Sequence, residues 1–402
     1  MALDLINLTP LQKKMMGAHK SKRYDHILTI APIRQGKTAG QAMIMADEGL
    51  MEYVRHGEYR EYIVAGVSVK TVRHNLGQYF REACQKLGVP FRDIGTPKDE
   101  WWMGDFACFR LFGAAEAGSE KKIWGATIQS NYFDEITLLH HDFYSAAWDR
   151  LSYDSSRVVA CGNAGNPWHW AKVEIINRPR PGIKHLEADF WDNPYYPDSR
   201  RKVVLAQGRE SDYRYRRNVL NQWCPAGSLV FPIEEKTMVV YGDESPLKGT
   251  VCIDPGTAGT VAALLFVRTP YGSLIKDEYI HVADVDGRLS DKEHLDRLQK
   301  RWQFNHVICD PAGSSMIAEA SSRGLMTSKG KNDIDKGVAA VNNALHRGLM
   351  KIDGERCLQT LMVAASYEMN QVTDKPIKNG YEHPWDAIRY GTMYFHPARG
   401  FF

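Results

Sequence analysis

The segment 31–38, with the sequence APIRQGKT, has the residue types of a phosphate-binding loop. The apolar run 27–30 before it predicts a short buried strand, and residues 39–46 after it predict a helix. A strand, a loop that ends in Gly-Lys-Thr and a helix form the local structure that such loops require. Ala31 replaces the first glycine of the usual pattern, so the assignment depends on the rest of the chain.

Four residues of this segment are predicted to contact ATP and its Mg²⁺ ion. The N–H groups at a helix start lack intrahelical partners, and the helix dipole is positive there, so Gln35 and Gly36 would hold phosphate oxygens. Lys37 would reach the outer phosphates, and the Thr38 hydroxyl would bind the magnesium ion.

Asp134 and Glu135 follow the predicted strand 128–133 and could complete an ATP-hydrolysing site. Asp134 would hold magnesium through water, and Glu135 would polarise the attacking water. This order of acids favours an enzyme that hydrolyses ATP repeatedly over a small-molecule kinase. The alternative is a strand that simply ends in a polar loop, and the phosphate-binding loop upstream argues against it.

Three further residues are candidates for the same site, each with an ordinary alternative. Arg34 could stabilise charge on the γ-phosphate, as an arginine finger does, or pair with a nearby carboxylate. Gln12 could hydrogen-bond the adenine edge or be a common helix-start residue. Asn163, at the end of the next predicted strand, could sense the γ-phosphate or water, or occupy a turn.

Three aspartates predict a second site. Asp254 and Asp310 each end an apolar strand, and Asp386 lies in the first turn of the last predicted helix. Converging carboxylates repel one another, but two divalent ions about 3.5–4 Å apart would bind them and form a phosphodiester-cleaving centre. Oxygen ligands favour Mg²⁺ or Mn²⁺. Each aspartate alone could be a turn or cap residue, and His383 could assist a metal or leaving group or cap the helix.

Two basic stretches could neutralise DNA phosphates, although both could instead be solvated surfaces. No base-reading motif accompanies them, so we expect binding to double-stranded DNA that is largely independent of sequence. The first combines arginines with tyrosines and the second is a lysine-containing loop; their members are Arg209, Arg214, Arg216, Arg217, Tyr213, Tyr215, Lys329, Lys331 and Lys336.

Length and composition indicate a globular α/β protein. The 402 residues are 44% hydrophobic and 25% charged, which fits two or three domains, and strands alternate with helices as in parallel sheets. The net charge of +3 excludes a generally basic protein but not a basic face. We expect a P-loop ATPase domain over 1–175, a connecting region over 176–245 and a second α/β domain over 246–402.

The cysteines and the apolar runs indicate the cellular compartment of the protein. Seven scattered cysteines without a Cys-x-x-Cys pair argue against zinc fingers and disulfides. The N-terminus lacks the apolar core of a signal peptide, and no run approaches the ~18 apolar residues of a membrane span. We expect a soluble, intracellular protein without membrane contact.

The combined motifs resemble the large subunit of tailed-bacteriophage DNA-packaging terminases over nearly the whole chain. The most specific of them is the last, in the C-terminal helix. They are Gln12 in LTPLQ, the loop 31–38 with its internal arginine, FDEI at 133–136, GNAGNP at 162–167, Asp254, Asp310, and DAIRY at 386–390.

The resemblance implies an ASCE/RecA-like P-loop ATPase domain followed by an RNase H-like nuclease domain. It implies an ATP-driven motor that moves double-stranded viral DNA into a procapsid, and an endonuclease that cuts concatemeric DNA. Glu135 would be the catalytic carboxylate, and Asn163 would couple hydrolysis to movement. The aspartates Asp254, Asp310 and Asp386 would bind metal.

The implied partners are DNA, the terminase small subunit and the portal protein of the procapsid. The chain would form a homo-oligomeric ring on the portal and be a monomer in isolation. It would act in the cytoplasm of the infected bacterial host and be absent from the mature virion. The arginine finger would come from Arg34 or a neighbouring subunit, with Arg73 and Arg81 as weaker candidates.

Two other functions fit parts of the sequence. A helicase-nuclease of DNA repair would need further helicase motifs between 170 and 250, and none is recognisable there. A virion or scaffold protein could use ATP binding as an assembly switch and carry an inactive nuclease. Substitution of Glu135 or Asp254 would then leave its function intact.

Overall fold

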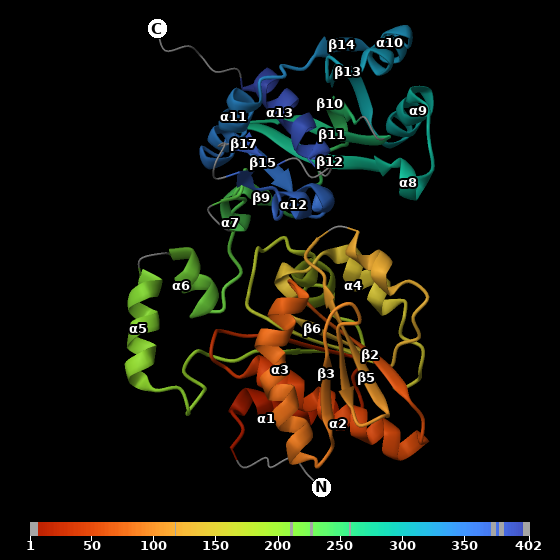
Figure 1. Cartoon of the computed structure of the whole chain (residues 1–402). Coiled ribbons are helices and arrows are strands. Elements are labelled where there is room, and N and C mark those ends of the chain that lie inside the picture. The colour runs from red at the N-terminus through yellow and green to blue at the C-terminus, as the bar shows by residue number, and fades with distance from the viewer. Residues whose placement is uncertain are drawn as a thin grey trace. The chain divides into compact units, whose positions relative to one another are not determined.

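The computed structural model of the protein describes residues 7–116, 118–209, 212–225, 228–256, 259–370, 375–377 and 382–396. The chain divides into two compact units, Met1–Gly165 with Trp170–Cys224 and Asn166–His169 with Pro225–Phe402. Each unit is built around one large sheet (Figure 1). None of the helices in the described ranges is both long and apolar enough to cross a membrane.

The N-terminal unit contains an eight-stranded sheet with helices packed on it. Its elements are α1 (Pro10–Ser21), β1 (His26–Ile30), α2 (Lys37–His56), β2 (Arg60–Gly66), α3 (Val69–Lys86), β3 (Phe91–Ile94), β4 (Glu100–Met103), β5 (Ala107–Gly113), the 3₁₀ helices η1 (Ser119–Ile123) and η2 (Ile136–Leu138), β6 (Ser130–Asp134), α4 (His141–Trp148), β7 (Arg157–Gly162), the π-helix η3 (Ala171–Ile176), β8 (Ile183–Leu186), α5 (Asp198–Arg209) and α6 (Asp212–Asn218).

The strand order of this sheet is β3-β4-β5-β2-β6-β7-β1-β8. The six strands from β5 to β8 in this order pair in parallel, and β3, β4 and β5 pair antiparallel. The predicted parallel α/β fold is therefore confirmed. Because β6, β7 and β1 are adjacent and parallel, their carboxyl ends lie at one edge of the sheet and place the residues that follow them side by side.

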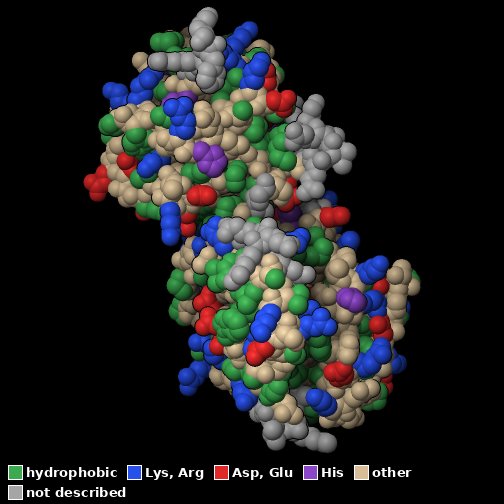
Figure 2. All heavy atoms as spheres, turned by 90° about the vertical axis from the view of Figure 1, so that its left-hand side faces the viewer, with side chains coloured by type: hydrophobic (Ala, Val, Ile, Leu, Met, Phe, Trp, Pro, Cys, Tyr) green, Lys and Arg blue, Asp and Glu red, His purple; other side chains and the backbone are tan. Residues whose placement is uncertain are grey.

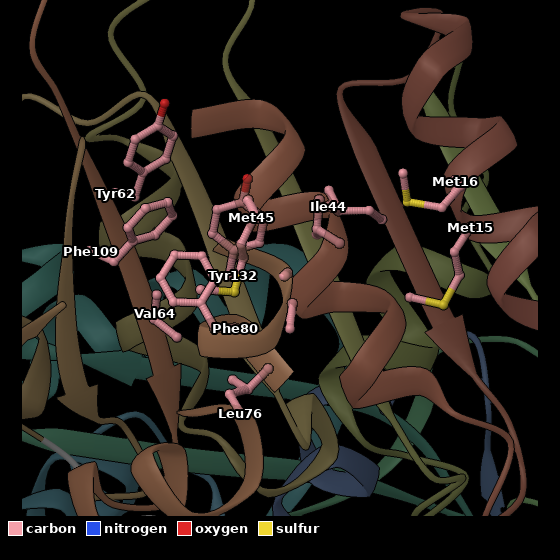
Figure 3. Close-up of a cluster of buried hydrophobic side chains, with 14 of the residues drawn as sticks. Met15, Met16, Ile44, Met45, Tyr62, Val64, Leu76, Phe80, Phe109 and Tyr132 are labelled. Atoms are coloured by element: carbon pink, nitrogen blue, oxygen red, sulfur yellow. The ribbon is translucent and has the colours of Figure 1, made fainter. Parts of the chain in front are cut away.

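Burial on both faces explains the apolar sequence of the central strands. All residues of β1, β6 and β7 are buried, as expected for parallel strands that helices cover on both sides. Aromatic rings fill one face: Tyr62 of β2 stacks on Phe109 of β5 with ring centroids 4.5 Å apart. Figure 3 shows these rings beside Tyr132 of β6 and Phe80 of α3.

The C-terminal unit contains a seven-stranded mixed sheet in the order β14-β13-β10-β11-β12-β15-β9. Its elements are α7 (Glu235–Met238), β9 (Val239–Val240), β10 (Lys248–Pro255), β11 (Thr260–Thr269), β12 (Gly272–Val282), α8 (Ala283–Asp286), α9 (Asp291–Arg301), β13 (Gln303–Cys309), α10 (Ser314–Ser322), β14 (Met326–Lys329), α11 (Ile334–His346), β15 (Met350–Asp353), α12 (Leu358–Ala364), β16 (Met369–Asn370), β17 (Lys375–Pro376) and α13 (His383–Phe395).

The β10, β11 and β12 strands form an antiparallel meander, and β13 pairs with β10 in parallel. The apolar runs 251–254 and 261–267 predict two strands of a hairpin, and the pairing of β10 with β11 confirms it, although Thr257 and Ala258 of the turn lie outside the described residues. Helix α13 crosses this meander closely at Gly391. A Cβ atom there would lie 2.6 Å from the Phe266 ring and 2.7 Å from Cys252 Sγ, so only glycine permits this approach.

The sequence pattern predicts a strand at 279–283 and a helix at 355–369, and both elements have a different length in the structure. The strand expected at 279–283 is the end of the longer β12, whose Lys276, Asp277 and Glu278 are buried. These three charged residues interrupt the apolar pattern from which a strand is predicted. Each has a partner in the fold; Lys276, for example, pairs with Asp353 at 3.1 Å. The helix expected at 355–369 is confined to α12, because Glu368 forms a β-bridge with Leu229 instead.

Candidate functional site

The phosphate-binding loop joins β1 to α2, as the sequence predicts. Gly36 is the N-cap of α2 at φ +79° and provides no side-chain cap, so the first N–H groups of the helix remain available to an anion. A Cβ atom at this position would lie 2.7 Å from Gln12 Nε2 and would also strain the left-handed backbone. Glycine is therefore favoured here by the left-handed backbone, and a side chain would also have to displace the Gln12 amide.

Lys37 lies buried beneath the loop. Its ammonium donates hydrogen bonds of 2.8 Å to the carbonyl oxygens of Ala31 and Pro32 and to Asn163 Oδ1. Burial lowers the pKa of Lys37, while the nearby Glu135 opposes that shift. The structure thus brings the loop of β1 and the residue after β7 into direct contact through this lysine.

Asp134, the last residue of β6, and Glu135, which follows it, join the same site. Thr38 Oγ1 lies 3.4 Å from Asp134 Oδ1, and Asn75 of α3 donates to Asp134 Oδ2 at 3.0 Å. Glu135 adopts a left-handed backbone with φ +53°. Burial raises the pKa of Glu135, and its Oε2 atom is buried without a hydrogen-bond partner among the described residues. This carboxylate oxygen therefore has its hydrogen-bonding capacity unused within the described part of the protein.

A cavity of about 820 Å³ spans this edge of the sheet. Its volume is in the range of small-molecule and cofactor sites. The residues predicted from the phosphate-binding loop line it together with Glu135 and Asn163, and aromatic side chains from α3 and the segment before α5 extend it. The lining residues are Asn7, Thr9, Gln12, Ile33, Arg34, Gln35, Gly36, Lys37, Thr38, Ala39, His74, Asn75, Gln78, Tyr79, Glu135, Asn163, Asn193, Tyr195 and Tyr196.

Three predicted nucleotide contacts have structural partners of their own. Gln12 accepts from the Thr9 N–H at 2.9 Å and donates to the Gly36 carbonyl at 3.1 Å, so its amide joins α1 to the loop. Gln35 is buried and donates to the Phe190 carbonyl at 3.0 Å. Arg34 is exposed at φ +64°, and its carbonyl accepts from Asn193. Arg73 pairs with Asp93 and with Asp99, the latter at 3.0 Å.

Sequence reasoning missed two contributions to this site. Thr71, Asn75 and Gln78 form a polar stripe at helical spacing on α3, which is a signal that the sequence does contain. Arg217 of α6 is predicted above to contact DNA, yet it lines a pocket of about 390 Å³ with Asp134 and Glu135. No sequence pattern indicates that placement, because it depends on how α6 docks.

The carboxylates of the C-terminal unit converge around α13. The Tyr390 hydroxyl donates to Asp254 Oδ1 at 3.4 Å and to Asp310 Oδ2. His383 Nδ1 lies 2.7 Å from Asp254 Oδ2, and this contact raises the pKa of His383. The structure therefore brings Asp254 and Asp310 to one hydroxyl group.

Asp386 is held differently. Arg389, one turn along α13, donates to Asp386 Oδ1 from Nε at 3.0 Å and from Nη2 at 2.6 Å. Burial raises the pKa of Asp386, and the negative charge of Asp254 adds to that effect while Arg389 opposes it. Asp386 and Asp254 are thus close enough to interact electrostatically.

The fit of these acids to divalent metals is mixed. Carboxylate oxygens are the ligands that Mg²⁺ and Mn²⁺ prefer. Within the described ranges, however, no group of three His, Cys, Asp or Glu side chains is arranged to hold a metal ion. The predicted aspartates instead have protein partners: Arg389 forms an ion pair with Asp386, His383 contacts Asp254, and the Tyr390 hydroxyl donates to Asp310.

The predicted DNA contacts are divided between the two units. On the face in Figure 2, Lys and Arg side chains are interspersed with Asp and Glu. Lys329, Lys331 and Lys336 are exposed, and the last two line a hollow of about 650 Å³ with Asn332, which Tyr390 contacts. The side chain of Arg209 lies outside the described part of the chain.

Comparison with known proteins identifies the fold. No model of a protein family matches the sequence, and no curated protein matches it. Among solved structures, the chain is similar to the large terminase of a thermophilic bacteriophage in complex with ADP. The sequences are 23% identical, the match covers 96% of this chain and 98% of that chain, and the TM-score is 0.50.

Two further structures are matched more weakly. The large terminase of bacteriophage HK97 is 13% identical, over 98% of this chain and 94% of that chain, with a TM-score of 0.47. The g2p nuclease domain of bacteriophage SPP1 with bound Mn is 14% identical, over 38% of this chain and 93% of that chain, with a TM-score of 0.30.

The chain therefore has the fold of a large terminase, built from two α/β units. The resemblance inferred from the sequence is confirmed at the level of the fold.

Proposed function

We propose that this protein is the large subunit of a bacteriophage DNA-packaging terminase. Its N-terminal unit would hydrolyse ATP to move double-stranded DNA into a procapsid, and its C-terminal unit would cut concatemeric DNA. The observation that carries this proposal is the assembly of Lys37, Thr38, Glu135 and Asn163 around one nucleotide-sized cavity. The terminase fold supports the same conclusion.

The residues of the cavity have separate tasks in ATP hydrolysis. The free N–H groups at the start of α2 hold phosphate oxygens, and Lys37 exchanges its internal acceptors for the outer phosphates. The hydroxyl of Thr38 and the carboxylate of Asp134 would hold Mg²⁺, which supplies charge neutralisation at the phosphates. Glu135 Oε2 accepts a proton from the attacking water, and burial makes that carboxylate a stronger base.

The carboxylates of the C-terminal unit would form the endonuclease. Asp254, Asp310 and Asp386 would hold two Mg²⁺ or Mn²⁺ ions, which supply charge stabilisation for phosphodiester cleavage. The convergence of Asp254 and Asp310 on Tyr390 supports this assignment. Lys331 and Lys336, beside the adjoining hollow, would neutralise phosphates of the bound duplex.

One experiment on the full-length chain tests both activities. ATP turnover should disappear in Lys37→Ala and persist in Lys86→Ala, an exposed lysine at the end of α3. Supercoiled plasmid cleavage with Mn²⁺ should disappear in Asp254→Asn and persist in Lys37→Ala. ATP turnover that survives Lys37→Ala would remove the motor from the proposal, and cleavage that survives Asp254→Asn would remove the nuclease site.

The remaining parts of the proposal follow from the terminase assignment. The chain would bind the terminase small subunit and the portal protein, and would form a homo-oligomeric ring on the portal. It would act in the cytoplasm of the infected bacterium and be absent from the mature virion. Copurification of the ring with procapsids, and its absence from purified virions, would test these partners and this location.

A second candidate function is favoured by one observation. The acids of the C-terminal unit are occupied by protein donors, and the described residues include no assembled metal-ligand group. A virion assembly protein that uses ATP binding as a switch, with an inactive nuclease, would have these features. It predicts no Mn²⁺-dependent cleavage by the unmodified chain, which the plasmid assay measures directly.

A further inference from the structure

Arg217 lies at the ATPase site although it belongs to the connecting region. Its Nε donates to the Ala164 carbonyl at 2.6 Å, which fixes the side chain beside the residue that follows Asn163. The half-buried guanidinium lines a pocket of about 390 Å³ with Asp134 and Glu135. Its position is therefore set by a specific contact and faces two acids of the site.

This pocket adjoins the larger nucleotide cavity. The two hollows share the lining residues Ile33, Asn75, Glu135 and Asn163, whereas Lys37 and Thr38 line only the larger one. Arg217 therefore faces Glu135 and Asn163 from the hollow that Lys37 and Thr38 do not line. A group bound between Lys37 and Glu135 would lie between two cations, one from the loop and one from α6.

We propose that Arg217 contacts the terminal phosphate of a bound nucleoside triphosphate and distinguishes it from a diphosphate. This role rests on the ATPase function proposed above. The terminal phosphate adds negative charge next to Asp134 and Glu135, and the forked guanidinium can donate to it while Nε keeps its bond to Ala164. A diphosphate lacks that group, so Arg217 contributes nothing to its binding.

Hydrogen bonds near Arg217 link the segment that carries it to the rest of the ATPase site, so the presence or absence of the terminal phosphate would affect that segment. The Asn218 carbonyl accepts from the Ile33 N–H at 3.1 Å, and Asn221 Nδ2 donates to the Ile30 carbonyl at 3.0 Å. The Cys224 N–H donates to the Gly165 carbonyl at 2.9 Å. Residues 217–224 thus bind both the phosphate-binding loop and the segment after β7. Release of the terminal phosphate removes one of the interactions that hold this segment.

The test compares Mg²⁺-dependent binding of ATPγS and ADP to the full-length chain by calorimetry. Arg217→Gln keeps a donor for Ala164 but removes the charge. It should weaken ATPγS binding about tenfold or more and leave ADP binding within about twofold of the unmodified chain. Lys202→Gln removes the charge of an exposed lysine of α5 that lines neither hollow, so it should not change the ATPγS-to-ADP preference.

Three outcomes would overturn the role of Arg217. They are equal weakening of both nucleotides in Arg217→Gln, unchanged ATPγS binding in that variant, and the same loss of preference in Lys202→Gln. If Arg217→Gln fails to fold, Arg217→Lys provides the test. Lysine keeps the positive charge but lacks the forked guanidinium, so the ATPγS-to-ADP preference should fall by about threefold. An unchanged preference would count against the role of Arg217. Lys37→Ala separates the two proposals, because it should weaken both nucleotides; if the unmodified chain binds neither, the ATPase function itself fails.

Discussion

The acids of the two units are held in opposite ways. In the N-terminal unit, Glu135 Oε2 is buried with no partner among the described residues and borders a large cavity. In the C-terminal unit, Asp254, Asp310 and Asp386 accept hydrogen bonds or ion pairs from His383, Tyr390 and Arg389. One site keeps an acceptor unpaired, and the other neutralises its acceptors within the protein.

This difference determines how much each site must rearrange before it can bind its ligand. An unpaired buried carboxylate costs folding free energy, but no protein donor has to be displaced before it accepts a hydrogen bond from a ligand. A carboxylate paired with a cation is more stable, but a metal ion must first displace that cation. The N-terminal site is therefore prearranged for its ligand, whereas the C-terminal site has to exchange partners.

The largest expected effect tests the unpaired acid. Glu135→Gln should lower kcat for ATP hydrolysis by about 10²- to 10⁴-fold, because the amide cannot accept the proton of the attacking water. Binding of ATPγS should change little, since the neighbouring loop remains intact. Steady-state kinetics with calorimetry measure both, and Glu187→Gln, an exposed acid of the same unit, is the control. A variant with normal kcat would mean that another residue activates water.

The next effect tests the neutralised acids. Arg389→Met should destabilise the C-terminal unit by about 3 kcal/mol, because it leaves Asp386 partly buried without its cation. Thermal unfolding measures the loss. Asp386→Leu in the same chain should recover most of it, since the uncompensated charge is then gone. No recovery in the double variant would show that Arg389 stabilises the unit through packing instead.

A smaller effect probes the exchange of partners. Tyr390→Phe removes the hydroxyl that Asp254 and Asp310 share, so a metal ion competes with one hydrogen-bond donor fewer. The Mn²⁺ concentration for half-maximal plasmid cleavage should fall about fivefold. Tyr394→Phe, an exposed position on the same helix, should leave it unchanged. A higher Mn²⁺ requirement in Tyr390→Phe would show that the hydroxyl orders the ligands.

The smallest effect is a shift in pH dependence. Burial raises the pKa of Glu135 above its ordinary value of 4.5, so the protonated, inactive form persists to higher pH than for an exposed glutamate. The kcat/KM for ATP should therefore decline, as the pH is lowered, at a pH above the usual carboxylate range. A decline at the ordinary glutamate pKa would contradict the buried environment.

The sequence predicted those parts of the ATPase site that depend on local structure. The loop after β1 and the acids after β6 each follow a short apolar strand, and adjacent parallel strands bring such residues together. The role of Gln12 is also local in origin, because it completes a capping box with Thr9. Its bond to Gly36 adds a tertiary contact that no local pattern reveals.

The parts that could not be predicted depend on tertiary packing. Arg217 belongs to a basic helix whose composition indicates a nucleic-acid surface, and only the docking of α6 places it beside Glu135. The partners of Asp386 and Asp254 depend on how closely α13 approaches the sheet at Gly391. A buried charge such as Lys276 makes a strand hard to predict, because the partners that allow its burial are distant in sequence.

The pairing of β8 with β1 has a consequence for any attempt to separate the ATPase. β8 lies in the region that follows residue 175, and its residues 183–186 pair in parallel with 26–29 of β1. A chain truncated at 175 would expose the backbone of β1 as an open sheet edge, which invites pairing between molecules and aggregation. Truncation after Cys224 keeps this edge covered and retains the segment that binds the phosphate-binding loop.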